Sequence, residues 1–291
     1  MVSPVIIQKV IDGALQEPQP DLLAIEEPLE IRLGFGPIDN RQQRSLSVTM
    51  RTPGADGPGA DQELALGYLY AEGIIREASD VVSCRHCVQD ATKQGNVLRV
   101  ELQPSVLIDW QLLERHTYAS SSCGICGKAS IDAVRASCPA TMTSGGFRVD
   151  AAVLQRLSDR VQAAQRAFSY TGGVHAAALF DADGQVLMLR EDVGRHNALD
   201  KLVGAALWNG QVPLQEYGIF LSGRIGFELV QKAWMAGVPV LVAVGAPTSL
   251  AVEMAREAGI TLIGFMRNQR FNVYTGVERV VVAEAIGYGN K

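Results

Sequence analysis

Two cysteines, Cys123 and Cys126, are separated by two residues within the segment Ser-Ser-Cys-Gly-Ile-Cys-Gly-Lys (121–128). A helix is predicted to begin just after them, with Lys128 in its first turn. The positive end of a helix and a nearby lysine both favour a thiolate, so a cysteine in this place is expected to be nucleophilic near neutral pH. The glycine after each cysteine leaves its sulfur atom uncrowded. This arrangement therefore indicates sulfur chemistry.

Three kinds of sulfur site are compatible with the pair. A zinc site would add Cys84 and Cys87, but the two pairs are farther apart than in a usual zinc ribbon, and the first lies in or beside a predicted strand. A dithiol pair of the thioredoxin type needs a core strand before it, whereas 116–122 is typical of a polar loop. The third is a thiol that carries sulfur as a persulfide. All three remain open at this point.

A zinc-dependent deaminase also combines a C-x-x-C pair with an α/β sheet. Its signature requires H-x-E as well, which supplies a metal ligand and the general acid/base. None of the four histidines has a glutamate two residues later, and these are His86, His116, His175 and His196. The sequence therefore argues against hydrolytic deamination.

The composition of the 291 residues sets broad limits. The net charge of −5 argues against general binding to nucleic acid or to an anionic membrane. The longest apolar run, 238–244, has the length of a strand and is too short to cross a membrane. The N-terminus shows no secretory signal, and five cysteines in a chain this long do not form a disulfide framework. We expect a cytoplasmic protein.

The pattern of apolar residues predicts an α/β fold with a β-rich N-terminal part. Strands are predicted at 29–35, 45–51, 81–87 and 97–102, around one helix at 62–71. Later strands are predicted at 174–180, 185–190, 217–221, 238–244 and 260–265, and they alternate with helices at 198–208, 226–236 and 249–258. Two consecutive β-α-β crossovers indicate a partly parallel sheet covered by helices. We divide the chain into a subdomain 1–110 and an α/β domain 111–291.

Charged and polar residues follow the predicted strands of the second half. Open α/β sheets bind ligands beyond the carboxyl ends of their strands. The candidate residues at this rim are Arg195, His196, Asn197, Ser222, Gly223, Arg224, Arg267 and Arg270. Four arginines beside two helix N-termini suit a phosphate or pyrophosphate group. Because neither a Rossmann fingerprint nor a P-loop is present, we expect a phosphorylated, nucleotide-like ligand bound by another route.

The remaining histidines and cysteines have simpler interpretations. His196 at the rim is a candidate acid/base or ligand contact, whereas His175 lies in an apolar strand and is predicted to be structural. Cys138 precedes a proline and is predicted to be an inert core thiol. Cys84 and Cys87 are predicted to be packing residues or accessory thiols.

Several segments together carry a resemblance to a known family. They are Met-Arg-Thr-Pro-Gly (50–54), Glu-Leu-Ala-Leu-Gly-Tyr-Leu-Tyr-Ala-Glu-Gly-Ile-Ile (63–75), Ser-Ser-Cys-Gly-Ile-Cys-Gly (121–127), Thr-Gly-Gly-Val-His (171–175), Arg-Glu-Asp-Val-Gly-Arg-His-Asn-Ala-Leu-Asp-Lys (190–201), Ser-Gly-Arg (222–224), Ala-Pro-Thr (246–248) and Gly-Phe-Met-Arg followed by Phe-Asn-Val-Tyr-Thr (264–275). With these residues in this order, the chain resembles the formate dehydrogenase accessory sulfurtransferase family.

The resemblance implies a cytidine-deaminase-like core that has lost the zinc chemistry. It also implies a sulfur carrier, which takes sulfur from a cysteine desulfurase and passes it to the molybdenum cofactor, bis-molybdopterin guanine dinucleotide, before insertion into formate dehydrogenase. Cys123 would carry the persulfide and Cys126 would be the second thiol. The stretch Phe265, Met266, Arg267, Asn268, Gln269 and Arg270 would bind the cofactor, with the rim arginines on its phosphates. The family implies a homodimer and no permanently bound cofactor.

A rival interpretation comes from a different class of protein. The chain could be a non-catalytic chaperone that shelters the cofactor, with both cysteine pairs holding zinc. A stoichiometric zinc ion bound through the two pairs would distinguish this scaffold from a sulfur carrier.

Overall fold

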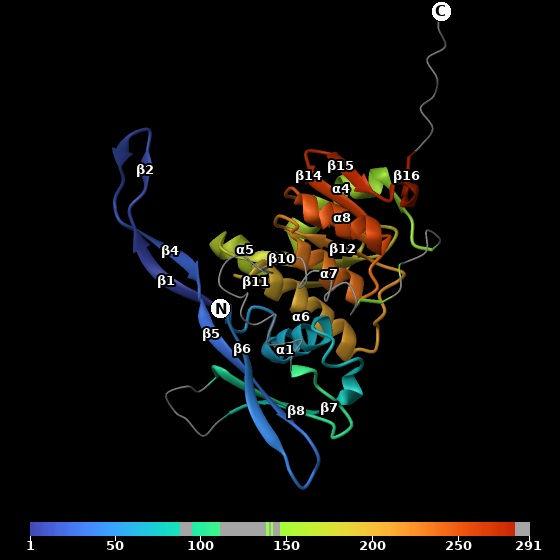
Figure 1. Ribbon diagram of the computed structural model, residues 1–291. Coiled ribbons are helices and arrows are strands. Elements are labelled where there is room, and N and C mark those ends of the chain that lie inside the picture. Colours follow the sequence, from blue (N-terminus) through green and yellow to red (C-terminus); the bar gives the residue numbers. More distant parts are fainter. Residues whose placement is uncertain (88–94, 111–137, 140, 142–145, 283–291) are drawn as a thin grey trace, which may run out of the picture.

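The computed structural model describes residues 1–87, 95–110, 138–139, 141 and 146–282. Two sheets make up most of the architecture (Figure 1). A six-stranded sheet is covered by helices on both faces, and a four-stranded sheet packs against a single helix. A two-stranded arm extends to one side of them (Figure 1).

The arm is formed by the first residues of the chain. Strands β1 (Val2–Ile7) and β4 (Gln19–Ala24) are antiparallel, and the short pair β2 (Val10–Ile11) and β3 (Ala14–Leu15) forms the tip. The sequence analysis predicted no strands here. The arm buries little of its apolar surface, since Ile6, Val10 and Leu15 are each more than 60% exposed.

The smaller sheet has the order β6-β5-β8-β7. Its strands are β5 (Glu27–Phe35), β6 (Gln42–Arg51), β7 (Val81–His86) and β8 (Val97–Leu102), and a 3-10 turn at Ala78–Asp80 precedes β7. Along β5, Leu29, Ile31 and Leu33 are fully buried and alternate with polar residues, which is the period of two of a sheet with one buried face. That face packs on helix α1 (Ala60–Ala71).

The larger sheet has the order β11-β10-β12-β13-β14-β15. Its strands are β10 (His175–Phe180), β11 (Val186–Asp192), β12 (Gly218–Leu221), β13 (Val240–Ala243), β14 (Thr261–Arg267) and β15 (Arg270–Thr275). The β12-β13-β14 core is parallel, as its crossovers require, and the other pairings are antiparallel.

Helices cover both faces of the larger sheet. Helices α6 (Arg195–Trp208), α7 (Phe227–Met235) and α8 (Ser249–Ala258) pack on one face. Helix α4 (Ala151–Ala164) packs on the other and leads into the short helix α5 (Arg166–Thr171). The minor parallel pair β9 (Val149–Asp150) and β16 (Val280–Val281), with a 3-10 turn at Val277–Arg279, closes that side.

Helix α1 joins the two sheets because it packs closely against α6. A Cβ atom at Gly67 would come within 1.8 Å of the carbonyl oxygen of Asp200, and one at Gly204 within 1.9 Å of that of Glu63. Only glycine allows the two backbones to approach so closely. Helix α6 is therefore buried nearly all round, between the larger sheet and α1.

The α/β class predicted from the sequence is confirmed, and so is the β-rich N-terminal part. The division between residues 110 and 111 remains a prediction, since it falls where the described residues stop. Within the described part of the chain, no helix combines the length and apolar character needed to cross a membrane.

Candidate functional site

The structure describes the residues of the predicted rim but not those of the cysteine pair. Cys123 and Cys126 lie outside the residues that the structure describes. The rim is fully described.

The strand directions place the predicted rim residues at one edge of the larger sheet. Strand β10 is antiparallel to both β11 and β12, so β11 runs in the same direction as the parallel strands β12, β13 and β14. Their carboxyl ends share an edge. His175, the first residue of β10, lies at the same edge because its strand runs the other way.

Contacts between successive loops connect this edge from one side to the other. A Cβ atom at Gly223 would lie 3.3 Å from the His175 ring and 3.8 Å from Arg195. The N–H of Gly245 donates to the carbonyl of Gly223 at 3.1 Å, and that of Phe265 donates to the carbonyl of Gly245 at 3.1 Å. The three predicted segments, 195–197, 222–224 and 265–270, thus belong to one continuous surface.

A pocket of about 500 Å³ opens beside this edge, between the end of α4, helix α5 and the sheet. Its polar and aromatic lining includes Gln162, Gln165, Phe168, His175, Phe220 and Ser222. Small-molecule sites in proteins have volumes of about 300–1,000 Å³. The pocket therefore has the size and the mixed lining expected of a ligand site.

Two members of the lining differ in how their polar atoms are satisfied. The hydroxyl of Ser222 accepts from the N–H of Ala176 at 2.9 Å, which fixes the loop after β12 to β10. Gln165 is only 7% exposed, yet its Nε2 has no hydrogen-bond partner among the described residues. A buried amide without a partner is costly, so a ligand that accepts from it would be favoured.

The α4–α5 side of this pocket was not predicted from the sequence, since no helix was expected between residues 151 and 171. The signal is present, because Leu154, Leu157 and Val161 are spaced for one helical face and are completely buried on the sheet.

The four arginines of the rim are not engaged elsewhere in the described structure. The Nε of Arg195 is buried and has no hydrogen-bond partner among the described residues. Arg224, Arg267 and Arg270 are exposed. Arginine presents a planar set of N–H donors that matches phosphate oxygens, so this edge can bind an anion.

The end of β14 and its turn into β15 have an unusual backbone. Phe265, Asn268 and Gln269 have φ values of 56°, 52° and 59°, a region that residues other than glycine rarely adopt. Such conformations cluster at binding sites, where the surrounding structure holds them in place. The side chain of Met266 is an exception within this stretch, since it is 1% exposed and packs in the core under α4.

The two histidines of the rim are both held in the neutral form. Burial, together with the nearby Arg195, lowers the pKa of His196 to about 3, and its Nε2 lies 3.1 Å from the carboxylate of Glu228. Burial and Arg195 also lower the pKa of His175. A neutral imidazole binds or orients a partner by hydrogen bonding. Whether His196 contacts a ligand remains a prediction.

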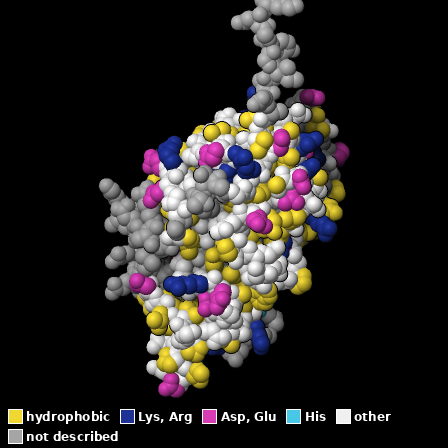
Figure 2. Space-filling view, turned by 90° about the vertical axis from the view of Figure 1, so that its right-hand side faces the viewer, with side chains coloured by type: hydrophobic (Ala, Val, Ile, Leu, Met, Phe, Trp, Pro, Cys, Tyr) yellow, Lys and Arg dark blue, Asp and Glu magenta, His cyan; other side chains and the backbone are white. Residues whose placement is uncertain are grey.

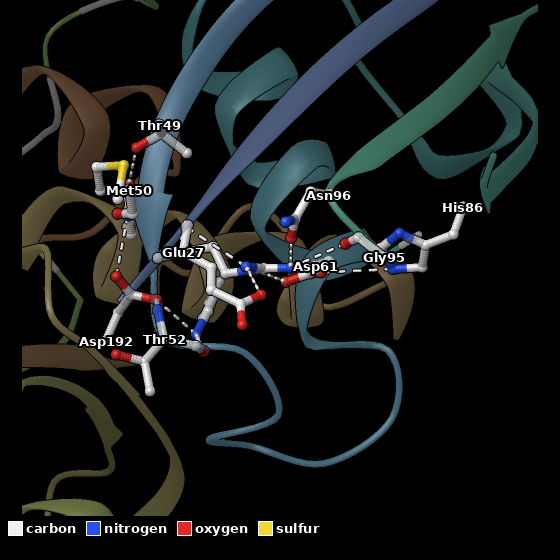
Figure 3. Close-up of polar contacts among 12 residues, drawn as sticks. Glu27, Thr49, Met50, Thr52, Asp61, His86, Gly95, Asn96 and Asp192 are labelled. Carbon is white, nitrogen blue, oxygen red and sulfur yellow. Dashed lines mark hydrogen bonds and ion pairs between the residues drawn. The ribbon is translucent and has the colours of Figure 1, made fainter. Parts of the chain in front are cut away.

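Asn197, a third predicted rim residue, connects the two sheets. Its Nδ2 donates to the carbonyl of Met50 at 2.7 Å and to the carboxylate of Asp192 at 2.9 Å, and its Oδ1 accepts from Thr49 at 3.1 Å. Asp192 also accepts from the N–H of Thr52 at 3.1 Å, and Thr49, Met50, Thr52 and Asp192 lie together in Figure 3. Asn197 thus fixes the end of β6 to the start of α6.

Asp192 and Lys201 form the centre of this junction. Both side chains are fully buried, and the Lys201 ammonium lies 2.7 Å from the Asp192 carboxylate. The same ammonium is 3.5 Å from Asp56, in the loop after β6. Asp192 and Lys201 both belong to the 190–201 segment that carries the family resemblance, but only the structure shows that they form a buried ion pair.

A second buried ion pair lies nearby, on the N-terminal side. Arg51 is 2% exposed and pairs with Asp61 at 3.0 Å, and it also donates to Gly95 and Asn96. His86 approaches the other oxygen of Asp61 at 3.4 Å, as Figure 3 shows. This cluster anchors the start of α1 to β6 and β7.

Two of the three described cysteines, Cys84 and Cys138, are poorly suited to chemistry. Burial raises the pKa of Cys84 to about 12, with a further contribution from Asp61, and burial likewise raises the pKa of Cys138 to about 12. Both thiols therefore stay protonated at neutral pH. Within the described ranges, no three His, Cys, Asp or Glu side chains are grouped to hold a metal ion.

Charges of both signs are scattered over the face of the molecule shown in Figure 2, and neither sign gathers in one region there.

The sequence matches the FdhD/NarQ family over residues 24–281. The chain belongs to this family. It is 49% identical over 286 residues to the sulfur carrier protein FdhD of Streptomyces coelicolor, a match that covers 97% of this chain and 96% of that protein. The FdhD protein of Mycobacterium tuberculosis is 45% identical over 270 residues, which cover 90% of this chain and 92% of that one.

A crystal structure from Desulfotalea psychrophila has a similar fold. The two chains superimpose with a TM-score of 0.69 over 96% of this chain and 99% of that one, at 22% sequence identity. The family match begins at residue 24, so the arm formed by β1 to β4 lies almost wholly outside it.

Proposed function

We propose that this protein is a sulfur carrier that accepts sulfur on Cys123 and delivers it to bis-molybdopterin guanine dinucleotide before that cofactor enters formate dehydrogenase. The observation that carries the proposal is near full-length similarity to proteins named sulfur carrier protein FdhD. The pocket and the unengaged arginines at the rim support the cofactor half of the proposal.

The first step is a thiol exchange. The thiolate of Cys123 attacks the terminal sulfur of a persulfide on a cysteine desulfurase. A new S–S bond forms on Cys123, and the old one breaks to release the thiolate of the desulfurase. The step transfers one sulfur atom without net oxidation or reduction.

Release of the sulfur as hydrosulfide requires two electrons, and Cys126 is the group that supplies them. Its thiolate attacks the inner sulfur of the Cys123 persulfide, which forms a Cys123–Cys126 disulfide and expels hydrosulfide for the molybdenum centre. A cellular dithiol reductant then restores both thiols. Because the two cysteines are separated by only two residues, such a bridge is sterically accessible, as in other C-x-x-C pairs.

The dinucleotide end of the cofactor is assigned to the pocket and rim. A guanine ring combines donors and acceptors on its edge with an aromatic face. Gln162 and Gln165 offer amides for the edge, and Phe168 offers a ring for stacking. The pyrophosphate would then extend along the rim towards Arg195, Arg224 and Arg267.

Two measurements test the proposal. The protein is incubated with a cysteine desulfurase and cysteine, and the added sulfur is mapped by mass spectrometry without reductant. We expect reductant-labile sulfur on the peptide that holds Cys123. We also expect a Cys123→Ala variant to bind the cofactor but fail to activate formate dehydrogenase. Activation by this variant, or stoichiometric zinc on the two cysteine pairs, would refute the carrier assignment.

Guanosine diphosphate reproduces the guanosine and pyrophosphate of the cofactor and serves as a probe of the pocket. Binding is measured by isothermal titration calorimetry. We expect Gln165→Ala and Phe168→Ala each to weaken it. The proposal also includes two partner proteins, a cysteine desulfurase and formate dehydrogenase. It includes a homodimeric state as well, which sedimentation velocity measures.

A further inference from the structure

Glu191 and Asp192 are consecutive residues of β11, and their carboxylates reach different elements. Asp192 belongs to the junction with β6 and α6. Glu191 extends the other way, to the start of α5. Successive side chains of a strand project to opposite faces, which explains how neighbouring acids serve two separate structures.

The carboxylate of Glu191 accepts three backbone hydrogen bonds. Its Oε2 accepts from the N–H groups of Arg166 at 2.9 Å and Ala167 at 2.7 Å, and its Oε1 accepts from that of Phe168 at 2.9 Å. Glu191 is 2% exposed, so these bonds are shielded from water. A buried carboxylate on the first turn of a helix satisfies N–H groups that no residue within the helix can bond.

Helix α5 depends on this external support. It has six residues, and a helix this short is marginal without tertiary contacts. The residue at its N-cap position, Gln165, makes no capping hydrogen bond with its side chain. Because Glu191 bonds the first N–H groups instead, the amide of Gln165 is free to line the pocket.

The backbone of Glu191 is also fixed, at both its N–H group and its carbonyl group. The N–H of Glu191 donates to Asp56 at 3.0 Å, and its carbonyl accepts from Lys201 at 3.0 Å. Glu191 thus links the rigid junction to the wall of the pocket, where α5 and its flanks contribute Gln165, Phe168 and the backbone after the helix.

We propose that Glu191 is a positioning residue for the cofactor pocket, which it builds by fixing the first turn of α5. The inference rests on the proposed function, because it gives a purpose to the pocket assigned there. Glu191 acts through the placement of Gln165 and Phe168 and does not itself line the pocket.

The test compares wild type with Glu191→Ala and Glu191→Gln. Calorimetry gives the Kd for guanosine diphosphate, amide hydrogen exchange reports on residues 166–168, and thermal unfolding gives Tm. We expect Glu191→Ala to speed exchange at these amides and to raise Kd by about tenfold, which corresponds to ~1.4 kcal/mol. Glu191→Gln keeps one oxygen acceptor, so it should show smaller changes in both.

Asp200→Asn is the matched control. Asp200 is 3% exposed and pairs with Lys232 at 2.7 Å, away from the pocket. We expect this variant to lower Tm and leave Kd unchanged. A wild-type Kd in both Glu191 variants would overturn the inference, as would an equal rise of Kd in Asp200→Asn. If wild type fails to bind the probe, the proposed ligand is wrong, and the inference falls with it.

Discussion

The junction around α6 and the pocket beside α5 contain buried polar groups of different kinds. In the junction, opposite charges lie close together, with Asp192 and Lys201 at 2.7 Å and Asp200 and Lys232 at 2.7 Å. At the pocket and rim, Gln165 and Arg195 each leave a buried nitrogen without a partner in the described structure. The contrast teaches that matched charges hold the two sheets together, whereas the pocket and rim keep buried nitrogens that a ligand can accept from.

The 190–201 segment contributes to both regions. Asp192, Asn197 and Lys201 serve the junction, while Arg195 faces the rim and Glu191 supports α5. A residue can therefore belong to a family motif because it holds the site in place. The predictions below separate the two roles, since changes in the junction should affect stability and changes at the rim should affect binding.

The largest effect is expected for Lys201→Met. Removal of the ammonium leaves the Asp192 carboxylate buried without a cation, and loss of one member of a buried pair costs about 3–5 kcal/mol. Urea unfolding should show that loss in the free energy of unfolding. Arg270→Ala, at the exposed turn, should stay within about 0.5 kcal/mol of wild type. A loss below about 1 kcal/mol for Lys201→Met would show that the junction does not depend on this pair.

Gly67→Ala tests the close contact of α1 with α6. The added methyl would meet the carbonyl oxygen of Asp200 at 1.8 Å, so the helices must separate, and overpacking of this kind costs about 1–3 kcal/mol. The control substitution Gly226→Ala has open space around it, and at the N-cap of α7 it should cost less than about 1 kcal/mol. The comparison is made by thermal unfolding, and equal Tm values for the two variants would contradict the structure.

Substitutions at the rim should have the opposite effect to those in the junction: they should weaken ligand binding and leave stability unchanged. A double variant with Arg267→Ala and Arg270→Ala should weaken the binding of guanosine diphosphate by at least about 1.5–3 kcal/mol, which is the contribution of one charge-assisted hydrogen bond from Arg267 to phosphate. Its stability should be unchanged, because both side chains are exposed. Arg76→Ala is a control at an exposed arginine of the N-terminal part. Calorimetry that gives one Kd for all three proteins would exclude these arginines from the site.

The smallest effect is a pH dependence in the junction. Burial raises the pKa of Asp56 from 3.8 to about 6, although the attraction of Lys201 opposes the shift. Because the pKa is higher in the folded protein, the contribution of Asp56 to stability is full below about pH 4 and is lost as the pH rises through about 6. Relative to Asp56→Asn, wild type should therefore lose on the order of 1 kcal/mol of stability between pH 4 and 7.

Urea unfolding of wild type and Asp56→Asn at several pH values measures the difference between their free energies of unfolding. His196 provides the opposite slope, because its pKa is lowered by burial and its contribution is lost as the pH falls from 6.5 towards 3. Because His196 is present in both proteins, its contribution cancels when the free energy of unfolding of Asp56→Asn is subtracted from that of wild type. A difference that is constant with pH would show that Asp56 is not buried as described.

Much of the fold was predictable from local patterns. The helix at 249–258 and the strand at 97–102 have the predicted bounds, because Thr248 and Gly259 mark the ends of the former and alternating apolar residues define the latter. The arm of β1 to β4 was not predicted. Its strands are stabilised mainly by each other, and their apolar residues face solvent, so no buried face leaves a pattern in the sequence.

The candidate site was predictable only in part. The arginines were found because strands that run in the same direction have their carboxyl ends at the same edge of the sheet. The pocket was not, since its lining comes from α4, α5, strands β10 and β12 and the adjoining loops, which approach one another only in the folded chain. The positive φ values at Phe265 and Gln269 carried no sequence signal either, because these residue types rarely adopt such a backbone, whereas Asn268 is of a type that adopts it more readily.

The sequence by itself determined the α/β class, the family, and the cysteine pair in which the proposed chemistry resides. Those conclusions depend on residue types and short spacings, which local interactions and motif order encode. The tertiary structure decided which residues of one motif face a ligand and which brace the fold. Glu191 and Asp192 are adjacent in the chain, yet strand alternation and long-range packing direct one to α5 and the other to α6.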